Sequence, residues 1–276
     1  MSIHLRELLM RELLALRYEP IDKRIRGRLG GETVVDSTRA LLVWEPRRVV
    51  PEYAFPESDV HGELVPAATE DPAGHGVEAM GAPRLGDRIV FDPSVPFSVR
   101  ATEGEALTLR AGGREAGAFR PADPDLHGHL IVEFAAFDAW FEEDERNVGH
   151  PRDPFHRIDI VHSSRDVRVE LDGEPLAESS APYLLFEPPL PVRFYLPAAD
   201  VRMDLLQPSD LRTFCAYKGE ASYLSLSGEP DVAWYYPAPL REAAEVTGRI
   251  AFFNELVDID VDGSRLERPV TPWSKR

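Results

Sequence analysis

A stretch of polar and aromatic residues in the second half of the chain carries the side chains that nucleophilic or acid–base chemistry requires. It contains Thr213, Cys215, Tyr217, Lys218, Gly219 and Tyr223. If residues 213–217 are extended, Thr213, Cys215 and Tyr217 lie on one face of the strand. Lys218-Gly219 would then form a turn that holds an ammonium group beside free backbone N–H groups, which suits an anion or a developing oxyanion.

Lys218 is the residue that we expect to act on a substrate. Neighbouring aromatic side chains would desolvate its ammonium group and lower its pKa, and a lysine in that state forms a Schiff base, acts as a base or binds an anion. Tyr195 and Tyr223 would donate or relay protons. The candidate substrate-binding residues are Arg157, Thr213, Cys215, Gly219, Trp234 and Tyr236.

Two residues are candidate acid–base partners of Lys218. Glu187 follows an apolar run and precedes a proline, as Glu45 does. It is therefore either a general base or the partner of an arginine or of a strand-end amide. His156 lies beside Arg157 where two domains would join, and it would bring a titratable imidazole to the same pocket.

The elements that must position these residues are mainly strands. Apolar and polar residues alternate, as in half-buried strands, most clearly in residues 107–110, 166–172 and 255–261. The 25 prolines and 19 glycines favour short strands and tight turns. Leucines at helical spacing in residues 5–16 predict a short amphipathic helix, and residues 240–246 predict another. The predicted fold class is mainly β, with few short helices.

The chain also contains an internal repeat. Residues 31–46 match residues 173–188 without a gap, and each copy continues to Pro-x-x-Asp-Val. Two shorter matches pair Ala139-Trp140 with Ala233-Trp234 and residues 166–173 with residues 256–263. The tryptophan match favours core packing over substrate stacking for Trp234.

The repeat predicts the domain organisation. An N-terminal helix at residues 1–20 would precede a first β domain at residues 21–160 and a second at residues 161–276. The first domain would carry a loop or insertion at about residues 65–127, part of which is rich in proline, glycine and alanine. We expect the second domain to hold the site, because only it keeps the Lys-Gly and aromatic cluster.

The composition excludes several classes of function. A formal net charge of −17 argues against sequence-independent binding of nucleic acid, which needs clustered lysine and arginine. The single cysteine, Cys215, excludes an intrachain disulfide and a cysteine-rich zinc site, and it favours a reducing cytoplasm. The chain contains no long uncharged apolar run, so we expect no membrane span. The N-terminal leucines would pack on a domain or on a second subunit, so a homodimer is one expected arrangement.

All eight histidines lie in the first 162 residues. His127, His129 and Glu133 would share one face of a strand, in an arrangement that zinc, iron or nickel accepts. No sharper motif supports a metal, so we predict none, and no motif for a nucleotide cofactor is present. Cys215 would need a base from the first domain to act as a nucleophile, which favours a small buried thiol instead.

Several motifs in order resemble one family. They are Arg193-Phe-Tyr-Leu-Pro-Ala-Ala-Asp-Val, Thr213-x-Cys-x-x-Lys-Gly-x-Ala-x-Tyr and Ala233-Trp-x-Tyr-Pro. Together they are similar to the family catalogued as domain of unknown function 427, over nearly the whole chain in a two-copy form. The resemblance implies two small antiparallel domains of the β-tent kind. Ala216 departs from the proline that the family commonly has after the cysteine.

The family's name suggests nucleotidyl transfer, which needs carboxylates that hold magnesium ions. Asp258, Asp260 and Asp262 would share one strand face. We take Arg168 and Glu170 as counterparts of the first two, so the same face accepts a cation there, and no Gly-Ser turn opens a helix nearby. A solvated sheet edge is therefore the favoured interpretation, and we do not predict this activity.

The sequence thus predicts an enzyme that needs no cofactor and acts on a small anionic or carbonyl-containing metabolite. The pocket would be lined by lysine and tyrosine in the second domain, and the reaction would be of the hydrolase, lyase or isomerase type. The alternative is a non-catalytic small-molecule-binding or regulatory protein. A scaffold role through the acidic surface and the N-terminal helix is a third expectation.

Overall fold

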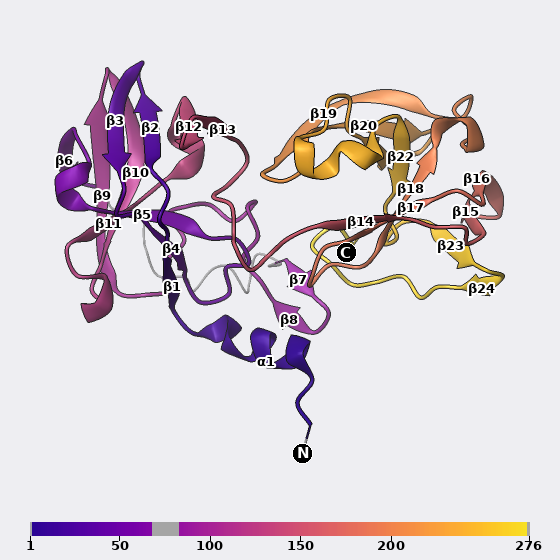
Figure 1. Cartoon of the computed structure of the whole chain (residues 1–276), viewed down its shortest axis with the longest axis horizontal. Helices are drawn as coiled ribbons and strands as arrows, with labels where there is room; N and C mark the ends of the chain where they lie inside the picture. Colours follow the sequence, from indigo (N-terminus) through magenta and orange to yellow (C-terminus); the bar gives the residue numbers. More distant parts are fainter. Residues whose placement is uncertain (1, 68–82, 275–276) are drawn as a thin grey trace. The chain divides into compact units, whose positions relative to one another are not determined.

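The computed structural model describes residues 2–67 and 83–274, and the chain divides into two compact units (Figure 1). Unit 1 comprises residues 1–83 and 89–153, and unit 2 comprises residues 84–88 and 154–276. The fold is mainly β and its sheets are antiparallel, as predicted. The division between the units falls after Asp153, so that His156 and Arg157 belong to unit 2.

Unit 2 contains a seven-stranded and a four-stranded sheet. The larger sheet has the order β14-β17-β18-β22-β21-β20-β19, and the smaller has the order β16-β15-β23-β24. The strands of the larger sheet are β14 (Asp159–His162), β17 (Tyr183–Phe186), β18 (Arg193–Pro197), β22 (Arg249–Phe252), β21 (Glu229–Tyr235), β20 (Gly219–Leu226) and β19 (Gln207–Cys215). Those of the smaller are β16 (Glu174–Ser179), β15 (Val167–Leu171), β23 (Asp258–Val261) and β24 (Ser264–Arg265).

Unit 1 contains the same two kinds of sheet. The larger has the order β1-β4-β5-β11-β10-β9-β6, and the smaller has the order β13-β12-β2-β3. The strands of the larger sheet are β1 (Arg17–Pro20), β4 (Leu41–Trp44), β5 (Glu52–Pro56), β11 (His129–Val132), β10 (Arg114–Pro121), β9 (Gly104–Ala111) and β6 (Glu63–Pro66). Those of the smaller are β13 (Glu145–Asn147), β12 (Ala139–Glu142), β2 (Ile25–Leu29) and β3 (Glu32–Ser37). A two-stranded hairpin of β7 (Arg84–Leu85) and β8 (Arg88–Ile89) interrupts the sequence of unit 1, and its residues 84–88 are assigned to unit 2.

The strand orders of the two units correspond one to one, so that positions in one unit can be equated with positions in the other. Local details agree with this correspondence between the two units. Both β2 and β15 carry a bulge against their hairpin partners, at equivalent positions. The Ser37 hydroxyl donates to Asp59 at 2.6 Å in unit 1, and the Ser179 hydroxyl donates to Asp200 at 2.6 Å in unit 2. The matched segments 31–46 and 173–188 therefore occupy the same place in their sheets.

The two shorter sequence matches, unlike the long one, do not join equivalent positions of the two units, so these two predictions are wrong. Trp234 lies on β21, whose counterpart is β10, and Phe119 holds the equivalent position there. Trp140 lies on β12, in the smaller sheet of unit 1. Residues 166–173 and 256–263 contain β15 and β23, which pair within one sheet of unit 2. Both segments alternate with period two and end at a glycine turn, which any two neighbouring strands can share without being copies.

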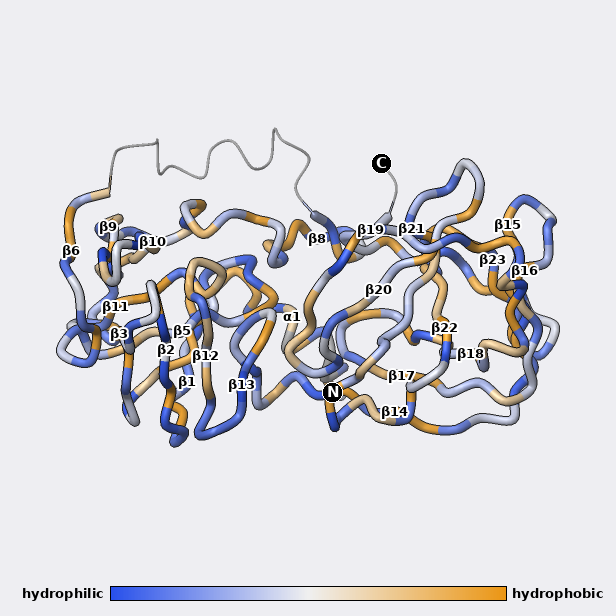
Figure 2. Tube along the Cα trace, turned by 90° about the horizontal axis from the view of Figure 1, so that it is seen from above, coloured by the Kyte–Doolittle hydropathy of each residue, from blue (hydrophilic) through white to orange (hydrophobic). Residues whose placement is uncertain are grey.

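The larger sheet of unit 2 is covered by apolar side chains on both faces. Leu184, Phe194 and Leu196 belong to a cluster that includes residues of the smaller sheet. Leu185 and Tyr195, one position along each strand, belong to a second cluster that includes residues of the 3-10 segment η6 (Arg241–Val246). Successive side chains of a strand point to opposite faces of its sheet. The hydrophobic stretches of the chain are orange in Figure 2. Each fully buried side chain of this size contributes about 1.5–3 kcal/mol.

The predicted helices are present but short. Helix α1 spans Leu5–Arg11 and the 3-10 turn η1 spans Glu12–Leu14, while strand β1 already begins at Arg17. The second predicted helix is the 3-10 segment η6 (Arg241–Val246). The predicted insertion at residues 65–127 contains the long hairpin of β9 and β10, and residues 68–82 of it lie outside the described part. Within the described residues, none of the helices has the length and apolar character needed to cross a membrane.

Candidate functional site

The centre of the site is a buried ion pair in unit 2 between Glu187 and Lys218. Glu187 directly follows β17, and Lys218 ends the turn between β19 and β20. The ammonium group donates a short hydrogen bond to Oε2 of Glu187. Only 8% of Lys218 is exposed, and 9% of Glu187. The sequence predicted an ammonium group desolvated by aromatic side chains and placed beside free backbone N–H groups, whereas the structure pairs this buried charge with a carboxylate.

His156 joins this pair from the segment before β14. Its Nε2 lies 3.3 Å from Oε1 of Glu187, the carboxylate oxygen that Lys218 does not contact. The imidazole ring stacks on Tyr217 with a centroid separation of 5.9 Å. Its Nδ1 has no hydrogen-bond partner among the described residues, and 22% of the side chain is exposed. The carboxylate thus orients the ring and leaves Nδ1 as the atom that can exchange a proton.

The pKa values of the buried pair favour two charged groups. For Glu187, burial raises the pKa, but the charge of Lys218 and hydrogen bonds from His156 and Lys218 outweigh it, so the pKa lies well below its ordinary value. For Lys218, burial lowers the pKa, but the negative charges that Cys215, Glu187 and Tyr195 carry when ionised raise it above its ordinary value. The predicted lowering of the Lys218 pKa is therefore wrong, because desolvation was considered without the carboxylate.

The tyrosines proposed as proton donors lie in the apolar cluster that includes residues of η6. Tyr195 is 1% exposed, its hydroxyl accepts a hydrogen bond of 3.0 Å from Trp234 Nε1, and burial raises its pKa to about 12. The Tyr223 hydroxyl lies 2.8 Å from Thr213 Oγ1, and burial raises its pKa too. Tyr236 is buried as well, and its burial raises its pKa. These rings form an aromatic core behind the ion pair.

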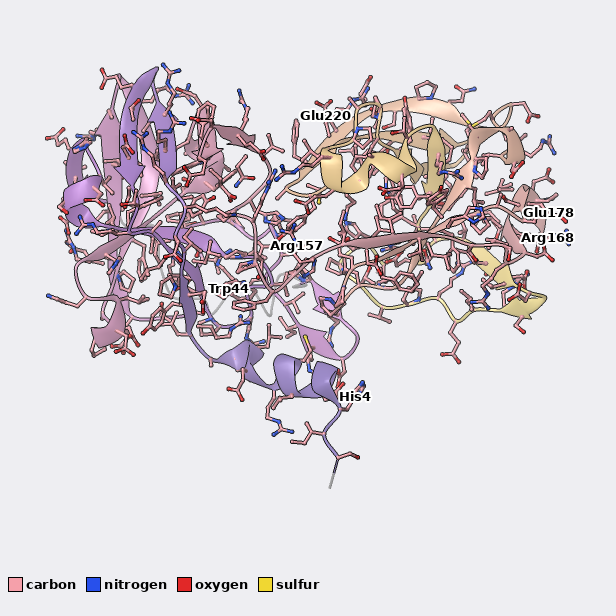
Figure 3. The ribbon with its side chains drawn as sticks, in the orientation of Figure 1. His4, Trp44, Arg157, Arg168, Glu178 and Glu220 are labelled. Atoms are coloured by element: carbon pink, nitrogen blue, oxygen red, sulfur yellow. The ribbon has the colours of Figure 1, made fainter. Side chains whose placement is uncertain are left out.

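The remaining predicted residues surround the turn that carries Lys218. Cys215 is half-buried and pairs across the hairpin with Gly219, which has a φ of 95° that favours glycine. Arg157 lies over the Tyr217 ring at 5.6 Å and donates to Glu242 at 2.8 Å, with half of its side chain exposed (Figure 3). Tyr217 itself follows the end of β19, so it does not extend the face shared by Thr213 and Cys215.

The aspartate cluster of β23 and the histidine cluster near Glu133, both considered in the sequence analysis, do not form a binding site in the described residues. Asp258 and Asp260 are bonded to arginines of the C-terminal segment, and Asp262 to Arg165. The Glu133 carboxylate accepts from a backbone N–H on β10. In the ranges 2–67 and 83–274, no group of three or more histidine, cysteine or acidic side chains is arranged to hold a metal ion.

Unit 1 has a buried carboxylate at the position equivalent to Glu187. Glu45 accepts from Arg100 at 3.2 Å and from the hydroxyl of Thr102, and Arg48 lies 3.7 Å from it. The sequence comparison identified the repeated Glu-Pro but missed Arg100, because this arginine lies in the irregular segment that the repeat does not cover. No histidine among the described residues contacts Glu45, and the cations beside its carboxylate are Arg100 and Arg48.

The ion pair predicts a dependence of stability on acid pH. Because the folded-state pKa of Glu187 lies below the ordinary 4.5, its contribution to stability is complete above about pH 4.5 and is lost as the pH falls through the lowered value. We expect the denaturation midpoint to fall more between about pH 5 and about pH 3 in the wild type than in Glu187→Gln. The exposed Glu178→Gln, labelled in Figure 3, should keep the wild-type dependence; an unchanged dependence in Glu187→Gln would contradict the assignment.

Residues 159–263 match the model of a family described as a domain of unknown function (DUF427). The match spans β14 to β23 and covers less than half of the 276 residues. It includes Glu187 and Lys218 and stops short of His156. The resemblance predicted from the motifs is confirmed for this part of the chain. Among curated proteins, the chain has no match.

Proposed function

We propose that unit 2, whose residues 159–263 form a domain of the DUF427 family, is an enzyme that transfers protons to or from a small anionic substrate. The observation that carries this proposal is the state of His156. Its Nε2 is held by a buried carboxylate, and its Nδ1 is unpartnered among the described residues on a partly exposed ring. An oriented imidazole of this kind is the commonest general acid or base in enzymes.

The buried pair would position His156 and would not react itself. Lys218 keeps Glu187 ionised, and an ionised Glu187 fixes the tautomer and direction of the imidazole. An ammonium group that is charged and bonded to a carboxylate is a poor nucleophile, because its lone pair is protonated. Schiff-base chemistry at Lys218 therefore has little support, whereas isomerase, lyase and hydrolase reactions that move a proton all fit.

Arg157 supports an anionic substrate. It follows His156 directly, lies over the same Tyr217 ring, and is half-exposed. Its hydrogen bond to Glu242 uses one terminal nitrogen, so a carboxylate or phosphate can approach the rest of the guanidinium group. A substrate held there would lie beside the proton-exchanging imidazole.

We further propose that unit 1 is a diverged copy of the same domain that has lost this chemistry. Its strand order is the same, but its buried Glu45 is bonded to Arg100, and no histidine in the part of the chain that the structure describes is bonded to it. A guanidinium group does not give up a proton at neutral pH, so it cannot replace the imidazole. The single cysteine supports a place in the reducing cytoplasm.

His156→Gln tests the enzymatic proposal. Small carboxylates and phosphates would be incubated with the protein in D2O, and proton NMR would detect solvent exchange, isomerisation or cleavage. We expect His156→Gln to lower turnover about a hundredfold to ten-thousandfold while the melting temperature stays close to that of the wild type.

His162→Gln is the matched control. His162 lies on β14 in the same unit, edge-on to Tyr183, and is not bonded to Glu187. It should keep wild-type turnover. Equal turnover in His156→Gln and the wild type would refute the role of His156.

The second candidate function is non-catalytic binding of the same anions. It is supported by the buried Glu45–Arg100 pair in unit 1, where the equivalent carboxylate is bonded to an arginine. A ligand that stabilises the protein without exchange or turnover, and that binds His156→Gln equally well, would establish this alternative.

A further inference from the structure

A groove of about 360 Å³ lies in unit 2, on the face of the larger sheet that carries Leu184 and Phe194. Its walls are largely apolar. They include Leu184, Phe186, Phe194, Val261, Leu266 and Arg165. The volume is within the range of small-molecule sites, and Tyr195 and Trp234 belong to the cluster on the opposite face of the sheet. The groove is therefore separate from the His156 site.

The equivalent positions of unit 1 can be read from strand pairing. Glu142 pairs with Ile25, as Val261 pairs with Val167, and the turns that follow both strands have a residue with positive φ, at Glu143 and Asp262. By the same correspondence Phe194 is equivalent to Tyr53, Leu266 to Asn147, and Arg165 to Lys23.

In unit 1 these positions form a closed polar network. Lys23 donates to Glu142 at 2.5 Å, and the Tyr53 hydroxyl donates to the other carboxylate oxygen at 2.8 Å. Asn147 donates to the Tyr53 hydroxyl at 3.1 Å. Glu142 is thus a carboxylate on a short aliphatic stem, held by a cation at the edge of the unit. It occupies the place that corresponds to the groove of unit 2.

At these equivalent positions unit 2 keeps the cation and lacks the carboxylate, while Glu267 is a further residue in the lining of the groove. Val261 stands where Glu142 stands in unit 1, and Arg165 stands where Lys23 does. The Arg165 Nε donates to Asp262 at 2.7 Å, but its two terminal nitrogens have no hydrogen-bond partner among the described residues. A guanidinium group with both terminal nitrogens unpartnered can bind one carboxylate through two parallel hydrogen bonds.

We propose that this groove binds a small carboxylic acid with an apolar body. Its carboxylate pairs with Arg165, as Glu142 pairs with Lys23 in unit 1, and its hydrocarbon part lies against Phe194, Val261 and Leu266. The side chain of Glu142 is in this sense a covalently attached mimic of the ligand. The site is independent of the proton-transfer chemistry at His156.

Titration of the whole protein with octanoate, followed by calorimetry, tests this site. We expect octanoate to bind, and affinity to fall about fourfold for each methylene removed down to butanoate. Arg165→Gln should weaken octanoate binding about tenfold and leave 1-octanol binding unchanged, because only the charged hydrogen bonds are lost. Leu266→Trp, at a position that is 39% exposed, should block the groove and abolish binding of both.

Two further variants complete the test. Arg168→Gln removes another half-exposed arginine, on β15, that is paired with Glu170 and does not line the groove, and it should bind octanoate like the wild type (Figure 3). Val261→Glu gives unit 2 an internal carboxylate and should prevent binding while preserving the circular dichroism spectrum. The proposal is overturned if octanoate does not bind the wild type, or if it binds Arg165→Gln or Leu266→Trp with unchanged affinity.

Discussion

Replacing Lys218 with methionine will destabilise unit 2 by about 3–5 kcal/mol, the usual cost of breaking a buried ion pair. The variant leaves the Glu187 carboxylate buried with His156 as its one remaining side-chain hydrogen-bond partner among the described residues. Hydrogen exchange of peptides from β17 to β22, followed by mass spectrometry in increasing denaturant, measures the opening free energy of this unit separately.

The double variant Glu187→Gln/Lys218→Met is the matched control. Removing both charges leaves no uncompensated carboxylate, so we expect it to regain most of the stability that Lys218→Met loses. A double variant less stable than the single one would show that the charged pair is stabilising by itself. Equal stability of Lys218→Met and the wild type would contradict the pairing of Lys218 with Glu187.

Arg193→Met is the second substitution with a large expected effect, also about 3–5 kcal/mol. Arg193 is 5% exposed and makes two hydrogen bonds of 2.7 Å to Glu255, one to each carboxylate oxygen. Its guanidinium group also lies 5.5 Å from the ring of Trp234 and 5.5 Å from that of Trp273. The variant removes these contacts and leaves Glu255 buried with only the Thr271 hydroxyl as a side-chain donor.

Denaturation followed by tryptophan fluorescence measures this effect, because Trp234 and Trp273 flank the replaced group. Arg202→Met is the control: this arginine forms a comparable two-bond pair with Asp204, but the pair is exposed to solvent. We expect little change there, since water screens the pair. A similar loss in both variants would show that burial does not decide the contribution of these pairs.

Much of the fold follows from local pattern. Period-two alternation in residues 166–172 and 255–261 predicted β15 and β23, because a half-buried strand exposes one face and buries the other. The gap-free match of residues 31–46 and 173–188 predicted strands that indeed occupy equivalent places in two sheets of the same order. The Trp140–Trp234 match failed because two residues are too short to distinguish descent from coincidence.

The sequence predicted which residues belong to the candidate site better than it predicted their charge and burial. The sequence named His156, Glu187 and Lys218 from their residue types, and the structure brings these three together by hydrogen bonds. The sequence predicted desolvation of Lys218 but not the carboxylate that keeps its ammonium group charged, since a partner 31 residues away in the chain leaves no local pattern. Arg165 and its groove were missed, because a groove comes from side chains that are distant in the chain.

The sequence by itself determined the mainly β class, the repeat, the acidic surface and the residue types of the candidate site, because these depend on composition and local periodicity. Tertiary structure alone decided which charges are neutralised inside the protein. Glu187 and Lys218 are 31 residues apart, and Lys23 and Glu142 are 119 residues apart. The pKa of a buried group depends on the partner that the fold brings to it, and the tertiary fold, not sequence distance, selects that partner.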